Sequence, residues 1–170
     1  MRLKISGARM VDPAARVDAV RDVYVADGRV AAIGKRPDGF STDREIDARN
    51  RVLIPGLVDL SARLREPGAE HKATVASETR AAARGGITTL CIPPDTDPVV
   101  DTPAVVELIH QRAAASGMAR VEVLGALTRG LEGNLLAEMG ALRDAGCIGV
   151  SNAYGPVGST EVMRRAMEYA

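Results

Sequence analysis

The spacing of hydrophobic positions changes near residue 55 of the chain. Before that point, short apolar stretches alternate with turn residues. Residues 23–26 and 29–33 are two such stretches joined by Asp27-Gly28, which supplies the positive φ angles of a tight hairpin turn. Further short strands are predicted at residues 3–5, 45–46 and 52–54. Residues 1–55 are therefore predicted to be β-rich.

From residue 56 onward, strand-like and helix-like patterns alternate. Strands are predicted at residues 57–62, 87–92, 121–126 and 147–151, with starts about 30 residues apart. Helices are predicted at residues 74–84, 102–117, 135–145 and 159–170. Repeated strand–helix units imply parallel strands, and strands that are apolar throughout imply burial on both faces.

The predicted helices carry recognisable start and stop residues. Thr102 and Pro103 are suited to the N-cap and first turn of the second helix, and Gly117 to its end. Gly85-Gly86 can close the first helix, since glycine readily takes a left-handed cap conformation. Ser159 can cap the fourth helix. In the third helix, four apolar residues are expected to face inward: Leu135, Leu136, Met139 and Leu142.

Four strand–helix units correspond to half of a (β/α)8 barrel, which typically needs about 250 residues. The predicted fold is therefore α/β, with strands of a small β-sandwich (1–55) followed by the first half of a barrel (56–170). The sequence ends without a helix stop signal, so we expect a chain whose barrel is completed elsewhere. Half a barrel alone would expose strand edges, so aggregation or a homo-oligomer is expected. A complete four-unit open sheet is the alternative.

Composition narrows the functional classes. Lys+Arg and Asp+Glu balance at 22 each, which favours neither a nucleic-acid nor an anionic-membrane partner. Aromatic residues are only 2% of the chain, so the core is expected to consist of Ala, Val, Leu and Ile. Cys91 and Cys147 lie in apolar runs typical of buried free thiols. No signal peptide or membrane span is visible, and a cytoplasmic protein is expected.

One segment carries a specific resemblance. Residues 54–68 read IPGLVDLSARLREPG, which resembles the dihydroorotase signature I-P-G-L-[VI]-D-x-H-x-H-L-R-E-P-G at the first barrel strand. Three other segments are similar to motifs of the same family, namely residues 81–89, 94–99 and 127–133. Residues 1–55 then correspond to the accessory β-sandwich of the family, part of which comes from the C-terminus.

The resemblance implies a catalytic divalent metal, yet the residues that would bind it differ. The two histidines of the H-x-H pair lie on one face of a strand, because strand side chains alternate with period two. Here these positions are Ser61 and Arg63. A serine hydroxyl is a poor zinc ligand. A guanidinium stays protonated, and at about 4 Å from a dication it would cost about 8 kcal/mol. These two substitutions predict the loss of the metal site.

A second region, after the fourth predicted strand, also lacks the metal ligands that the resemblance implies. The stretch after the fourth strand resembles the F-S-D-D-G-x-P-V of type I dihydroorotases, in which an aspartate also serves the metal centre. Its two acidic positions are Asn152 and Ala153 here. We therefore predict no catalytic residues, no bound metal and no cofactor, with Ser61, Arg63, Asn152 and Ala153 as lost ligand positions.

Of the two residues that the resemblance assigns to substrate binding, one matches the family pattern and the other differs from it. Arg65 matches the family arginine that pairs with the dihydroorotate carboxylate, whereas the partnering asparagine is replaced by Asp95, whose charge should repel that carboxylate. Both are vestigial substrate-binding candidates. Without the metal, a salt bridge from Arg65 to Glu66 or Asp95 is the favoured interpretation.

The remaining candidates have simpler structural interpretations. Asp59 is expected to pair with Arg63, and Glu66-Pro67-Gly68 to form a turn. His71 and His110 are the only histidines and are expected at the surface.

Three functions remain open. The resemblance favours a noncatalytic homologue that serves as an assembly subunit for aspartate carbamoyltransferase, a partner implied by the family. An active cyclic amide hydrolase of the dihydroorotase, hydantoinase or allantoinase type would need ligands outside this segment. A module that binds a pyrimidine intermediate through Arg65 is the third possibility.

Overall fold

The structure is a computed structural model that describes residues 1–170. The chain divides into two compact units, Met1–Pro55 and Gly56–Ala170. None of its helices is long and apolar enough to span a bilayer.

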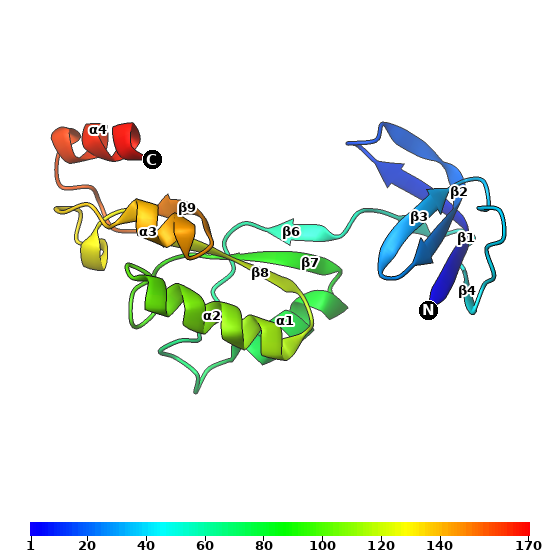
Figure 1. Ribbon diagram of the computed structural model, residues 1–170, viewed down its shortest axis with the longest axis horizontal. Coiled ribbons are helices and arrows are strands. Elements are labelled where there is room, and N and C mark those ends of the chain that lie inside the picture. The colour runs from blue at the N-terminus through cyan, green and yellow to red at the C-terminus, as the bar shows by residue number, and fades with distance from the viewer. The chain divides into compact units, whose positions relative to one another are not determined.

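The first unit is a five-stranded sheet. Its strands are β1 (Arg2–Asp12), β2 (Val17–Ala26), β3 (Arg29–Ile33), β4 (Arg44–Asp47) and β5 (Val52–Leu53). The order is β3-β2-β1-β4 (Figure 1). Strand β5 also pairs with β1. The β-sandwich assignment stays a prediction, because residues 1–55 form a single sheet.

The predicted hairpin is confirmed. β2 and β3 are antiparallel, with Ala26 opposite Arg29, and the turn residues Asp27 and Gly28 have φ angles of 52° and 73°. Two positive φ angles in a two-residue loop give a backbone twist that matches the twist of the flanking strands. β1 is much longer than the predicted strand at residues 3–5, because its polar residues alternate with buried ones such as Ala8 and Met10.

The first unit departs from the prediction of an aliphatic core. Tyr24 and Phe40 are both buried, and their rings meet edge to face with centroids 5.3 Å apart. The other buried hydrophobic residues of this unit are Ala8, Met10, Val23 and Ala48, so the two rings are its largest buried apolar groups.

The second unit is a parallel sheet with helices. Its strands are β6 (Leu57–Asp59), β7 (Ile87–Ile92), β8 (Arg120–Ala126) and β9 (Cys147–Ser151), in the order β6-β7-β8-β9. The helices are α1 (Val75–Arg84), α2 (Pro103–Ser116), the short 3-10 turn η1 (Arg129–Leu131), α3 (Met139–Asp144) and α4 (Thr160–Tyr169). This arrangement confirms the predicted α/β class.

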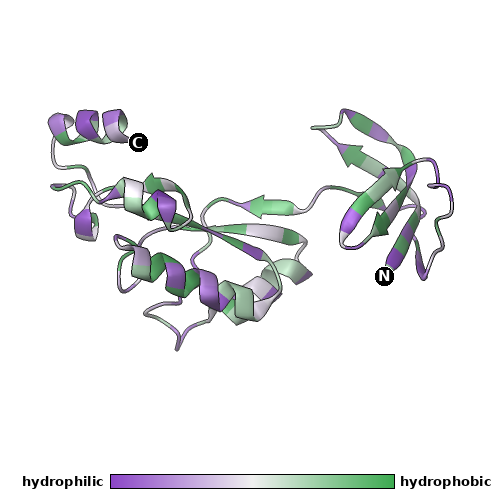
Figure 2. Ribbon diagram, viewed as in Figure 1, coloured by the Kyte–Doolittle hydropathy of each residue, from purple (hydrophilic) through white to green (hydrophobic).

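Most of the predicted helix signals are confirmed. Thr102 is the N-cap residue of α2, although its side chain makes no capping bond, and Gly117 ends the helix in the left-handed conformation with φ 61°. Ser159 accepts a hydrogen bond from the Val162 amide at the start of α4. Hydrophobic and hydrophilic stretches alternate along α2 (Figure 2), and Val105, Val106 and Ile109 are buried.

The core of this unit is aliphatic, as predicted. Buried Leu, Val, Ile and Ala side chains form one cluster, which also contains Cys147 and includes no aromatic residue. Ile92, Val106, Ile109, Val123 and Leu142 are among its least exposed members. Cys91 and Cys147 are buried free thiols, which confirms that prediction.

Two predicted elements were too long. The helix predicted at residues 135–145 is only α3, and Leu135 is 67% exposed instead of facing inward. The preceding residues form a loop in which Leu136 makes an isolated bridge with Thr128. The strand predicted at residues 57–62 ends at Asp59, whose carboxylate accepts a hydrogen bond from the Ser61 amide at 2.9 Å. Such a local side-chain bond competes with strand pairing.

Candidate functional site

The candidate residues gather at one edge of the parallel sheet. The carboxyl ends of parallel strands share an edge, and in α/β barrels the active site lies there. The loops that follow β6, β7 and β9 carry all six positions singled out in the sequence: Ser61, Arg63, Arg65, Asp95, Asn152 and Ala153.

Arg63 connects three of these loops. Its Nε lies 2.8 Å from Oδ2 of Asp95, in the loop after β7, and both side chains are 25% exposed. Its Cζ lies 4.5 Å from the centre of the Tyr154 ring, in the loop after β9. The hydrogen bond to Asp95 raises the pKa of Arg63 further above its ordinary value. Tyr154 was not identified from the sequence, because nothing in its neighbourhood signals a partner in another loop.

Asp59 does not pair with Arg63, contrary to the expectation. Its Oδ1 accepts the hydrogen bond from the Ser61 amide, and the guanidinium instead reaches across to Asp95. Ser61 itself is exposed. Ser61 and Arg63, predicted on the first strand, thus lie in the loop after β6 and present a hydroxyl and a paired cation.

Arg65 and Asp95 line one hollow of about 220 Å³, which Arg63 also borders. The expected salt bridge from Arg65 to Glu66 or Asp95 is not formed. Asp95 pairs with Arg63, and Glu66 pairs with Arg112 of α2 at 3.3 Å. Arg65 is exposed and takes part in no ion pair.

Glu66 does more than form the predicted turn. Its Oε2 accepts a hydrogen bond of 2.8 Å from the amide of Val75, the first residue of α1, while its other oxygen faces Arg112. A carboxylate at a helix N-terminus satisfies a free amide and complements the helix dipole. Glu66 thus anchors the loop that carries Arg63 and Arg65.

Asn152 is buried and fully engaged. Its Oδ1 accepts a hydrogen bond of 2.6 Å from the Thr128 hydroxyl, which in turn accepts one of 2.9 Å from the Gly133 amide. Its Nδ2 donates to the carbonyl of Gly155 at 2.9 Å. Asn152 therefore joins the loop after β9 to the loop after β8. The adjacent Ala153 offers no donor atom in its side chain.

The histidines lie outside this group. His71 is exposed, as expected, and His110 of α2 is half-buried, with its Nε2 close to Gly146. No three His, Cys, Asp or Glu side chains in residues 1–170 come together as a potential metal-binding group.

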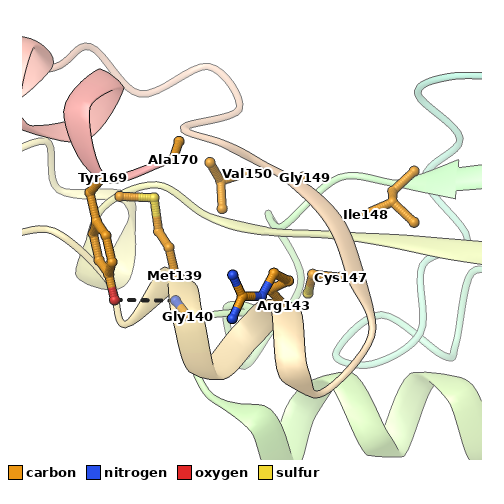
Figure 3. Close-up of a pocket in the computed structure, with 9 residues that line it drawn as sticks. All are labelled: Met139, Gly140, Arg143, Cys147, Ile148, Gly149, Val150, Tyr169 and Ala170. Carbon is orange, nitrogen blue, oxygen red and sulfur yellow. Dashed lines mark hydrogen bonds between the residues drawn. The ribbon is translucent and has the colours of Figure 1, made fainter.

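A second hollow, of about 240 Å³, lies between α3, β9 and the end of α4 (Figure 3). The Tyr169 hydroxyl accepts a hydrogen bond of 3.2 Å from the Gly140 amide at its rim. Its one charged residue, Arg143, is already paired with Asp144. Converging polar groups are absent, so the carboxyl edge is the better candidate site.

Comparison with known proteins shows the family of the chain. The family model described as dihydro-orotase-like matches residues 50–170. The chain belongs to this dihydroorotase-like family.

Full-length relatives of the family are more than twice as long as the chain. It is 52% identical over 170 residues to a "Dihydroorotase-like protein" of Pseudomonas aeruginosa, covering all of this chain and 40% of that protein. It is 51% identical over 168 residues to a "Dihydroorotase" of Anaeromyxobacter sp. (strain K), covering 99% of this chain and 39% of that protein. The chain thus spans about two fifths of the length of these relatives.

Solved structures confirm the predicted barrel architecture. L-hydantoinase from Arthrobacter aurescens superposes with a TM-score of 0.71 at 25% identity, over 87% of this chain and 32% of that chain. A dihydroorotase crystal structure gives a TM-score of 0.61 at 14% identity, over 99% and 48% of the two chains. The chain therefore has the fold of the N-terminal part of an amidohydrolase barrel.

The residues at the carboxyl edge do not fit the divalent metal that the dihydroorotase resemblance implies. One ligand position holds a guanidinium, and Asn152 directs its NH₂ group toward the carbonyls of Gly155 and Pro156. Neither group offers a free lone pair to a cation.

Proposed function

We propose that this chain is part of a noncatalytic dihydroorotase-like protein of pyrimidine biosynthesis, which acts as an assembly subunit for aspartate carbamoyltransferase in the cytoplasm. The observation that carries the loss of catalysis is the Arg63–Asp95 ion pair of 2.8 Å at a first-strand metal-ligand position. A permanently charged group there opposes a second cation.

The pattern of retained and replaced residues supports this proposal. A contact that builds the scaffold is present at a position that matches the family pattern, the Glu66 bond to α1. The replaced positions are those that would bind the metal. A scaffold that keeps its fold and loses its ligands is suited to binding a partner, and the transferase would supply the chemistry.

The first experiment measures metal and turnover on the full-length protein. We expect less than stoichiometric zinc by elemental analysis and no ring opening of dihydroorotate, beside a catalytically active dihydroorotase as positive control. Stoichiometric zinc with metal-dependent turnover would instead establish an active cyclic amide hydrolase with ligands outside this segment.

The second experiment tests the partner. We expect aspartate carbamoyltransferase to co-purify with the tagged full-length protein, and the native transferase complex to become smaller when the protein is deleted. An unchanged size and activity of the transferase in the deletion strain would refute the assembly role.

One observation favours a second candidate function, the binding of a pyrimidine intermediate. The unpaired Arg65 lines the 220 Å³ hollow and could hold a carboxylate. Calorimetry with dihydroorotate and carbamoyl aspartate tests this, with Arg65→Met as the comparison. Absence of heat with wild-type protein would dispose of this candidate.

A further inference from the structure

Arg63 and Tyr154 belong to loops at opposite ends of the parallel sheet. Arg63 follows β6 and Tyr154 follows β9, and these are the two outer strands of the order β6-β7-β8-β9. Neighbouring strands lie about 4.8 Å apart, so two outer strands separated by three such steps would be about 14 Å apart in a flat sheet. Arg63 and Tyr154 nevertheless meet, with 4.5 Å between the guanidinium carbon and the ring centre, so their contact spans the carboxyl edge from one outer strand to the other.

Arg63 also holds the loop in between. Its ion pair with Asp95 joins the loop after β6 to the loop after β7, and both side chains are largely shielded from solvent. Tyr154, in contrast, is 84% exposed, so its ring is the solvent-facing side of this contact. The side chain of Arg63, in the loop after β6, thus contacts residues that follow two other strands, β7 and β9.

We propose that Arg63, Asp95 and Tyr154 form a metal-independent tie that holds the carboxyl edge together where an active relative would use a metal ion. This inference rests on the proposed loss of the metal. Coordination bonds link the loops that supply the ligands. A guanidinium can do the same, because it pairs with a carboxylate through its edge and stacks on an aromatic ring through its face.

The tie gives a charge balance that needs no ion. Arg63 stays protonated at all physiological pH values and neutralises Asp95, whose position in the family pattern holds an uncharged asparagine. The change to Asp95 is thereby explained together with the change to Arg63: each charge provides the counter-charge of the other.

Hydrogen exchange followed by mass spectrometry on the full-length protein tests the tie. The variants are Arg63→Met, which keeps the length of the stem and removes the charge, and Tyr154→Leu, which removes the ring. Arg164→Met is the matched control, because Arg164 forms a surface ion pair with Glu168 on α4. Each protein is measured with and without EDTA.

We expect Arg63→Met to accelerate exchange in residues 93–101 and 152–158 by about two- to fivefold, the range that corresponds to an exposed cation–π contact. Tyr154→Leu should accelerate exchange in 152–158, with no further increase in the double variant. Arg164→Met should leave both segments unchanged.

Unchanged exchange in 152–158 for Arg63→Met, or effects that add in the double variant, would overturn the tie. If Arg63→Met does not fold, Tyr154→Leu decides alone, and unchanged exchange there overturns the tie. Faster exchange of the wild-type protein in EDTA would show a structural metal, and then the proposed function fails as well. If the variants do not change exchange as expected and EDTA does not affect exchange of the wild-type protein, only the tie is refuted and the proposed function stands.

Discussion

The guanidinium of Arg63 stacks on the ring of Tyr154 at 4.5 Å, although the two residues follow the outermost strands of the parallel sheet. The same side chain pairs with Asp95. The position at which the dihydroorotase resemblance implies a metal ligand thus contacts two other loops of the scaffold. Asn152, a second position at which the resemblance implies a metal ligand, also makes structural contacts, with Thr128 and Gly155.

Replacing Asn152 by aspartate should destabilise the protein by about 1–3 kcal/mol, the cost of leaving buried polar groups unsatisfied. The Nδ2 donor to the Gly155 carbonyl would become a carboxylate oxygen facing that carbonyl. Denaturant unfolding measures the effect. Asn134→Asp is the control, since Asn134 is exposed and should tolerate the charge. Equal stability of the two variants would contradict the role given to Asn152.

Leu142 and Leu135 should respond very differently to truncation. Leu142 is fully buried, so Leu142→Ala should cost about 2–5 kcal/mol through lost burial and a cavity. Leu135 is 67% exposed, and Leu135→Ala should change the unfolding free energy by less than about 0.5 kcal/mol. Comparable losses in thermal or denaturant unfolding would show that Leu135 does face inward.

Glu66→Gln should cost about 1 kcal/mol, because the amide keeps an acceptor for Val75 but loses the charge at the start of α1 and opposite Arg112. Glu138→Gln is the matched control. Glu138 pairs with Arg129 on the surface, where such pairs contribute little. The difference between the two variants should shrink in high salt, and a salt-independent difference would point to packing instead.

Burial of Cys147 should make stability sensitive to alkaline pH. Desolvation raises the pKa of its thiol from 9.0 to about 11. The folded state therefore retains a proton that the unfolded state releases above pH 9. The stabilisation is fully present below pH 9 and is lost as the pH rises toward about 11.

Unfolding free energies of wild type and Cys147→Ala, measured between pH 8 and pH 11, isolate this contribution. The wild-type protein should lose more stability over this range than the variant. Parallel pH dependence of the two proteins would mean that Cys147 ionises as easily when folded as when unfolded.

Local chemistry made much of this protein predictable. Asp27-Gly28 predicted the hairpin, and Gly117 predicted the end of α2. The repeated apolar runs predicted the parallel strands. Each of these features depends on the preferences of a few adjacent residues. The unsuitability of Ser61 and Arg63 as metal ligands also follows from residue type alone. These features need no knowledge of distant contacts.

Tertiary structure decided the partners of the charged and polar side chains. Neighbours in the sequence and the family pattern favoured pairs of Arg63 with Asp59 and of Arg65 with Glu66 or Asp95. The structure forms none of these pairs. Parallel strands bring together loops that are far apart in the chain, so Arg63 can reach Tyr154 and Asn152 can reach Thr128. Which side chains meet in these loops depends on the order of the strands and the path of each loop. Neither can be predicted from the local spacing of residues.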